Sequence, residues 1–348
     1  MPFRSRVDPS IVGQYKIEFA NCFREGLSRE SYRRDIPPSR WFSRGWTYQE
    51  EWLSSRTLYV GLGSMGFTCA SIGHCVYGQR REKSVMSLRK ALSKYGHYMG
   101  GMWAESVYIY CDRYLTAADD RLPAMSGIAG AFSNSMGDGY LAGIWKSDIL
   151  RGVLWSYIPN GEPQIRSLGK LLESISNPET YIAPSWSWAG HRYIQFELMY
   201  TDDRLISHCQ ATGSTTVHGN NKFGRVTEGY LLLTGRTWDI GPRTSIIKVE
   251  KEKMLTLGEN MRVIHQLDWT TDGQLLRGNF KLILLASYYD AASAEGESRR
   301  VVQSFGLILH KWKSTKSFVR VGTFKSEIRD VSIDVFFRQL DIETVRVI

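Results

Sequence analysis

A carboxylate flanked by an indole and an amide is the first candidate for chemistry in this 348-residue chain. It is Glu50, which lies one residue after Gln49 and four after Trp46. On a helix these three side chains share one side, because residues three and four apart are neighbours. A carboxyl group in such surroundings can have a raised pKa and take part in acid–base or electrostatic catalysis. The residues alone favour a structural alternative, in which Glu50 pairs with Arg44 or Arg56, because structural ion pairs are common.

A second candidate is a pair of serines close to a histidine. Ser185 and Ser187 alternate with Trp186 and Trp188, and His191 follows three residues later. No Gly-x-Ser-x-Gly elbow surrounds either serine, and a catalytic triad is defined by geometry, not by proximity in sequence. We therefore expect the two tryptophans to point to one face of an extended segment and to anchor it in the core.

A glycine-rich stretch and a small group of thiols are weaker candidates. Gly61-Leu-Gly-Ser-Met-Gly66 matches the dinucleotide-binding pattern, which requires a helix that starts inside the glycines. The residues that follow it are interrupted by Gly73 and form helices poorly, so we disfavour a cofactor site. Cys69, His74 and Cys75 are fewer than the roughly four ligands of a zinc site, so no metal is predicted.

Charge and composition limit the partners. Lys and Arg number 44 against 35 Asp and Glu, a net charge of 44 − 35 = +9. The basic cluster from Arg80 to Lys94 is best explained as the solvated face of a helix, so nucleic acid is not an expected partner. No apolar run approaches the ~20 residues of a membrane span, and no secretory signal follows Met1. Five scattered cysteines favour a reducing compartment, so we expect a cytoplasmic location.

Hydrophobic periodicity divides the chain into a helical half and a strand-rich half. Helices are expected at 8–25, 41–53, 83–95, 100–113, 122–132, 138–155, 165–175 and 329–340. Strands are expected at 56–60, 228–236, 279–287, 303–312, 318–324 and 343–348, and residues 61–79 are expected to be irregular. This order predicts an α+β fold with a helical N-terminal half and a strand-rich C-terminal half.

The stretch from Trp41 to Gly61 resembles a motif of the fungal heterokaryon-incompatibility (HET) domain family. The family carries Arg-x-Trp-Thr-x-Gln-Glu followed by Leu-Ser-x-Arg-x-Leu-Tyr-Phe. The spacing is kept here, with Val60 in the place of the last Phe. The matching positions are Arg44, Trp46, Thr47, Gln49, Glu50, Leu53, Ser54, Arg56, Leu58 and Tyr59.

Segments further along the chain match others that accompany this domain, in the family's order. The longest runs from Tyr110 to Ala129, contains Asp120, and resembles the family's Asp-Lys-Leu-Pro-Ala-Leu-Ser-Gly-Leu-Ala. Further matches are the segments 140–145, 154–155, 183–189, 223–226 and 306–309. The segment 183–189 contributes Trp186 and Trp188. The family's two N-terminal motifs are absent from residues 1 to 40.

The resemblance implies a three-part organisation and a function. Residues 1–62 are expected to be the C-terminal remnant of a TIR-like α/β HET domain, 63–190 a mostly helical connecting region, and 191–348 a strand-rich region. Family members act in fungal non-self recognition and trigger programmed cell death. Because it lacks the two N-terminal motifs, this chain is expected to be an incomplete member that is inactive as a single chain. The resemblance implies a protein partner, either a second copy or another HET-family chain.

The HET domain is also remotely similar to TIR domains, some of which cleave NAD. In that alternative Glu50 would hold the ribose hydroxyls and stabilise an oxocarbenium-like transition state, with NAD as a substrate and no bound cofactor. A second alternative is an interaction protein without catalysis. An exposed apolar patch near 41–59 is expected in that case.

Overall fold

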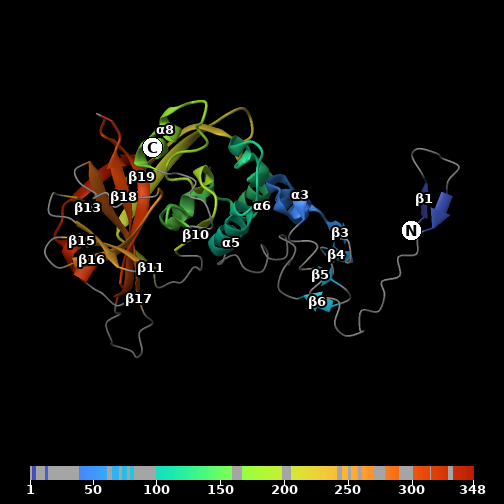
Figure 1. Cartoon of the computed structure of the whole chain (residues 1–348), viewed down its shortest axis with the longest axis horizontal. Coiled ribbons are helices and arrows are strands. Elements are labelled where there is room, and N and C mark those ends of the chain that lie inside the picture. The colour runs from blue at the N-terminus through green and yellow to red at the C-terminus, as the bar shows by residue number, and fades with distance from the viewer. Residues whose placement is uncertain are drawn as a thin grey trace. The chain divides into compact units, whose positions relative to one another are not determined.

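The chain, shown in Figure 1, forms two compact units. In this computed structural model one unit comprises residues 1–43 and 50–91, and the other comprises residues 44–49 and 92–348. The described residues are 2–4, 12–14, 39–60, 65–69, 73–76, 79–81, 99–158, 167–197, 205–240, 245–249, 252–257, 261–269, 279–289, 301–313, 315–327 and 332–348. The predicted helix at 83–95, which carries most of the basic cluster, lies outside them.

The first unit contains short helical and antiparallel elements. Helix α2 (Arg40–Ser43) and the helix predicted at 41–53, α3 (Gly45–Leu53), are both formed, and α3 continues into the second unit. The four strands of one antiparallel sheet are β3 (Arg56–Val60), β4 (Met65–Cys69), β5 (Gly73–Val76) and β6 (Gln79–Arg81).

Two expectations for this unit are wrong. Residues 61–79 are not simply irregular, because β4 and β5 lie within them, and Gly66 pairs with Tyr59 in a strand instead of opening a helix. The helix predicted at 8–25 is replaced at Val12–Gln14 by strand β2, which pairs with β1 (Pro2–Arg4). The other residues of that predicted helix lie outside the described ones.

Three helices of the second unit confirm the periodicity. They are α5 (Met99–Cys111), α6 (Ser126–Met136) and α8 (Leu168–Ser176). Two 3-10 turns, η2 (Ala118–Asp120) and η3 (Pro123–Met125), lead into α6. Helix α6 ends at Gly137, whose φ of +66° is the left-handed conformation that glycine adopts at helix ends.

The helical character predicted at 138–155 is largely wrong. Strands β7 (Tyr140–Leu141) and β8 (Ile144–Trp145) form a tight hairpin there. A turn with positive φ at Ala142 (40°) and Gly143 (103°) joins them, which no helix can contain. The remaining elements are η4 (Lys146–Asp148), α7 (Ile149–Gly152) and β9 (Trp155–Tyr157), and β9 pairs with β10 (Ile194–Phe196).

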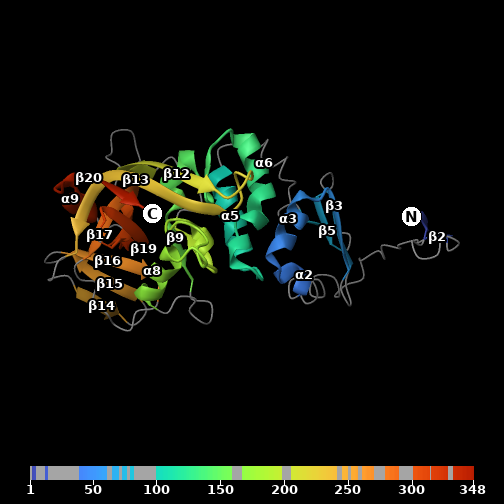
Figure 2. The ribbon, with the colours of Figure 1, turned by 90° about the horizontal axis from the view of Figure 1, so that it is seen from above.

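The C-terminal half is built on long strands, as predicted. The main sheet contains β11 (Leu205–Ser207), β12 (Cys209–Val217), β13 (Val226–Asp239), β14 (Ser245–Val249), β15 (Glu252–Leu257), β16 (Met261–Leu267), β17 (Phe280–Tyr289), β18 (Val301–Lys311), β19 (Ser317–Ser326) and β20 (Ile342–Val347). Five of these strands pair in a closed ring, in the order β13, β17, β18, β19 and β20 and back to β13. Figure 2 shows the β12–β13 hairpin extending from this sheet toward α5 and α6.

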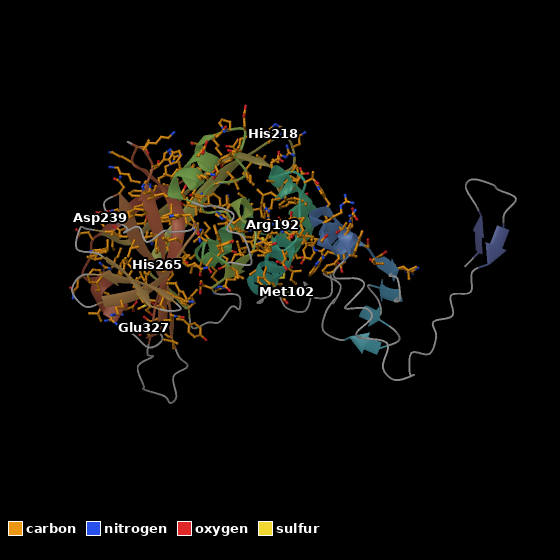
Figure 3. All side chains as sticks on the ribbon, viewed as in Figure 1. Met102, Arg192, His218, Asp239, His265 and Glu327 are labelled. Atoms are coloured by element: carbon orange, nitrogen blue, oxygen red, sulfur yellow. The ribbon has the colours of Figure 1, made fainter. Side chains whose placement is uncertain are left out.

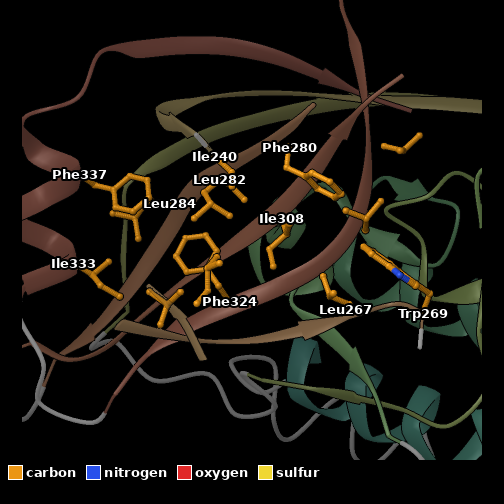
Figure 4. Close-up of a cluster of buried hydrophobic side chains, with 14 of the residues drawn as sticks. Ile240, Leu267, Trp269, Phe280, Leu282, Leu284, Ile308, Phe324, Ile333 and Phe337 are labelled. Atoms are coloured by element: carbon orange, nitrogen blue, oxygen red, sulfur yellow. The ribbon is translucent and has the colours of Figure 1, made fainter. Parts of the chain in front are cut away.

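The core of this half is a cluster of buried hydrophobic side chains from the strands and from two helices (Figure 4). Strand residues such as Leu282, Ile308 and Phe324 are almost fully buried there. Helix α9 (Ser332–Arg338) contributes Phe337, whose ring lies 5.9 Å from that of Phe324. Helix α8 contributes Leu171. The chain is therefore an α+β protein with its helices mainly in the N-terminal half and its long strands in the C-terminal half. Within the described ranges, no helix is long and apolar enough to cross a membrane.

Candidate functional site

A polar network joins the predicted motif helix to two distant segments. The indole nitrogen Nε1 of Trp46 donates to Asp120 Oδ2 at 3.2 Å. The other oxygen of Asp120, Oδ1, accepts from Arg225 Nη2 at 2.7 Å. Arg225 Nη1 lies 2.8 Å from Asp119 Oδ2, so a single guanidinium bridges two adjacent carboxylates. We call Trp46, Asp119, Asp120 and Arg225 the bridging network.

A 3-10 turn and a hairpin loop position the side chains of the bridging network. The 3-10 turn η2 places both carboxylates on the same short segment. Arg225 lies in the loop of the β12–β13 hairpin, where its backbone oxygen accepts from His218 N at 2.7 Å. Phe223 anchors the same loop, with its ring 5.3 Å from that of Tyr140. The loop is thereby held against the helical part of the second unit.

Gln49 makes a second contact inside the same unit. Its Oε1 accepts from the backbone nitrogen of Gly127 at 2.6 Å. Gly127 lies in the first turn of α6, where backbone N–H groups have no partner inside the helix. Gln49 therefore acts as a cap supplied by another element.

The backbone after Arg44 also contacts the residues that follow the C-terminal end of α5. Gly45 N donates to Tyr114 O at 2.7 Å, and a Cβ on Gly45 would approach Leu115 Cδ2 to 2.5 Å. Thr47 Oγ1 accepts from Arg113 Nη1 at 3.3 Å. Residues 44–49 of the first motif thus hold the helix in position through packing and hydrogen bonds.

Glu50 is in different surroundings from Trp46 and Gln49. Its side chain is exposed, and its backbone oxygen accepts from Ser54 Oγ at 2.6 Å. Arg56 is exposed as well. A catalytic role for Glu50 stays a prediction. Leu53 and Leu58 are exposed, and Trp46 is 38% exposed; an apolar patch near 41–59 stays a prediction.

The tryptophan-rich segment lies in the core, as expected, but it is not extended. Ser185–Ser187 is a turn, and Trp188–Gly190 is the 3-10 turn η5. Trp186 and Trp188 are fully buried. Trp188 Nε1 donates to Gly143 O at 2.7 Å, the same oxygen that accepts from Trp103 Nε1 at 2.8 Å.

The serines and the histidine of that segment are occupied with structural contacts. Ser187 Oγ donates to Ala142 O at 2.5 Å, and Ser185 Oγ accepts from Arg320 N at 2.9 Å. The His191 ring packs on Trp155 with 4.8 Å between ring centroids. Burial, with nearby arginines, lowers the pKa of His191 to about 3, so the ring is neutral at physiological pH. The three groups form no nucleophile–base arrangement.

Two buried polar clusters carry no signal in the sequence pattern. Arg320 and Asp268 form an ion pair of 2.5 Å in the core, and the guanidinium carbon lies 3.4 Å from the centroid of the Trp155 ring. Burial raises the pKa of Asp268 to about 6 against the opposing effect of Arg320. The pair links β19 to the end of β16 and to β9.

The second cluster resembles a Ser–His–Asp set in composition only. Ser287 Oγ donates to Asp334 Oδ1 at 2.7 Å and lies 2.8 Å from His208 Nε2. The same Nε2 lies 3.3 Å from Asp334 Oδ1, so the imidazole does not relay between the two groups as in a triad. Ser287 is fully buried, and Tyr289 OH also donates to Asp334. The cluster fastens α9 to β17.

A pocket of about 540 Å³ lies beside the bridging network. Asp119 and Arg225 belong to both. One wall is the end of α8 with the segment that follows it, and the other is formed by β12, β13 and β20. Figure 3 labels His218, a lining residue in the hairpin loop. Burial raises the pKa of the Tyr181 hydroxyl in the first wall, and Glu228 raises it further. No group of three or more acidic, histidine or cysteine side chains suited to a metal occurs among the described residues.

Compared with known proteins, the chain matches no family model, no curated protein and no solved structure.

Proposed function

We propose that the chain acts in fungal non-self recognition as a HET-family protein, and that it does so in the cytoplasm by binding a protein partner whose recognition leads to cell death. One observation supports this proposal most: segments that carry the resemblance, far apart in the sequence, contact one another. Trp46 of the first motif binds Asp120 of the second, and Arg225 of a third binds the same carboxylate.

The remaining contacts follow the same pattern. Gln49 of the first motif caps Gly127 of the second. Trp188 and Ser187 of the 183–189 segment bind Gly143 and Ala142 of the 140–145 segment. These contacts support the inference that the motif segments form one folded unit. Because the motif side chains are used in structural hydrogen bonds, they favour a binding function over catalysis.

The NAD-cleaving alternative has no comparable support. It depends on Glu50, whose side chain is exposed, while the side chains expected to frame it bind Asp120 and Gly127. It stays a prediction of the resemblance alone.

Inducible expression of the full chain in a filamentous fungus tests the proposal. We expect induction to lower the number of viable colonies at least tenfold relative to uninduced cells. Unchanged colony counts, with the chain accumulating as folded protein, would contradict the proposal.

A further inference from the structure

One face of the β12–β13–β20 sheet lines the pocket. Thr216 pairs with Glu228, Ser214 with Tyr230, and Leu232 with Arg346. Successive side chains of a strand alternate between faces, and directly opposite residues share a face. Glu228, Tyr230 and Arg346 therefore lie on the same face, and all three line the pocket.

Arg346 is a cation available for an oxyanion. Its guanidinium carbon lies 4.3 Å from the centroid of the Tyr230 ring. A stacked guanidinium keeps its N–H groups in the plane and free for a bidentate bond. No acidic side chain of the described part of the chain lies within ion-pair distance of Arg346.

Glu228 is the matching anion. Its Oε1 accepts a hydrogen bond of 3.0 Å from the Thr216 hydroxyl, and no cationic side chain in the described ranges pairs with it. The other acid of the pocket, Asp119, is already ion-paired with Arg225. Among the charged side chains that line the pocket, Glu228 and Arg346 are thus one of each sign with no ion pair in the described part of the chain.

Along the strands, the positions that carry the two charged side chains lie on either side of Tyr230. Glu228 and Leu232, the partner of Arg346, are four residues apart, which is about 13 Å along a strand. Tyr230 lies between them, and Ile175, Pro178 and Ile182 face the same pocket from the other wall. A small organic anion would use Arg346 alone and leave Glu228 without a partner.

We propose that this pocket binds an extended peptide segment of a partner protein, with a basic and an acidic side chain four residues apart. In an extended chain such side chains share a face and are also about 13 Å apart. The basic side chain pairs with Glu228, the acidic one with Arg346, and the residues between them contact Tyr230. This inference rests on the proposed function, since it names the chemistry by which the partner is recognised.

Peptide pools with fixed charges test the proposal on the purified full chain. Each pool is five residues long, has blocked termini, carries fixed first and fifth residues, and has uncharged mixtures between them. The four charged pools are Lys/Glu, Glu/Lys, Lys/Lys and Glu/Glu, and binding is measured by fluorescence anisotropy against an uncharged pool. We expect one mixed pool to bind at least tenfold tighter than either like-charge pool.

Variants assign each end of the peptide. Glu228→Gln should abolish the preference for Lys, and Arg346→Gln the preference for Glu. The double variant E228R/R346E should reverse which mixed pool is preferred. Asp341→Asn and Lys311→Gln change exposed charges outside the pocket and should leave binding unchanged. Circular dichroism checks that each variant is folded.

Three results would overturn the peptide site: no pool bound above the uncharged one, equal binding of like-charge pools, or a preference for Glu/Glu alone, which indicates an organic anion. Loss of viability on expression, together with any of these, would leave the proposed function standing and remove only the peptide site.

Discussion

Gln49 and Glu50 are neighbours in α3 with opposite surroundings. The Gln49 amide oxygen caps Gly127, whereas the Glu50 side chain is exposed. Gln49→Leu leaves the Gly127 N–H without its partner, so we expect the free energy of unfolding to fall by about 1–2 kcal/mol. Glu50→Gln is the matched control, with an expected change within about 0.5 kcal/mol. Urea unfolding of both variants measures the difference, and equal stabilities would contradict the capping role.

The same control variant tests catalysis. If the chain acts by binding, nicotinamide release from NAD by the purified chain is the same for the wild type and for Glu50→Gln. An assay of free nicotinamide compares them. Release that depends on Glu50 would favour the NAD-cleaving alternative over the proposed function.

His191 makes stability depend on pH. Its folded-state pKa is about 3, and in the unfolded chain it is about 6.5. Below pH 6.5 the unfolded chain therefore takes up a proton that the folded chain does not, so stability falls as the pH falls toward 3. We expect this group to contribute a loss on the order of 4 kcal/mol over that range.

The variant His191→Phe keeps a ring against Trp155 but cannot titrate. Thermal unfolding between pH 7 and pH 4 should show a smaller loss of stability for this variant than for the wild type. Parallel pH profiles would mean that His191 is not held neutral by burial.

Among the elements, the turn between β7 and β8 holds the tryptophan-rich segment 183–189 in place by hydrogen bonds. Gly143 has a φ of +103°, and a Cβ there would lie 2.5 Å from Trp188 Nε1. Gly143→Ala should therefore destabilise the chain by about 2–3 kcal/mol, since it combines backbone strain with a steric clash. Gly190→Ala is the control, because a Cβ at Gly190 meets nothing within 4 Å. A similar melting temperature for the two variants would contradict this role of the turn.

Elements with a clear period could be predicted from the sequence. The apolar positions of α5 and the alternating or continuous apolar runs of β17 and β19 identified these elements to within a few residues. The segment 138–155 shows the limit. Leu141, Ile144 and Trp145 have helical spacing, but the positive φ at Gly143 turns the chain between them. Such a turn depends on packing against Trp188, which lies 45 residues away.

The candidate site was only partly predictable for the same reason. The sequence motifs identified Trp46, Gln49, Asp120, Trp186 and Trp188, but not which groups they bind. The hydrogen bond from Arg225 to Asp120 joins residues 105 apart, and no local pattern encodes it. Arg320, Asp268 and Arg346 were missed because a charged residue in a strand is usually solvated, and only the tertiary structure shows where it lies.

For the molecule as a whole, the buried ion pair joins parts of the chain that the sequence separates widely. Arg320 binds Asp268 and also the carbonyl oxygen of Trp155, which lies 165 residues earlier. Removing either charge leaves the other buried and unpaired, so Asp268→Asn or Arg320→Met should each cost about 3–5 kcal/mol.

The double variant R320M/D268N removes both charges at once. It should cost clearly less than the sum of the single changes, because no buried charge is left unpaired. Guanidinium unfolding of the three variants measures the coupling. Additive effects would show that the two side chains act independently.

We infer that the assembled motif segments carry the proposed function. The most direct measurement is the number of viable fungal colonies after induction of Arg225→Ala, which breaks the bridges to Asp119 and Asp120. Lys222→Ala changes another cation of the same loop and is the matched control. We expect Lys222→Ala to lower the number of viable colonies as the wild type does, and folded Arg225→Ala to leave at least tenfold more viable colonies than the wild type. The inference would be contradicted if both variants lowered the number of viable colonies equally, or if neither variant lowered it.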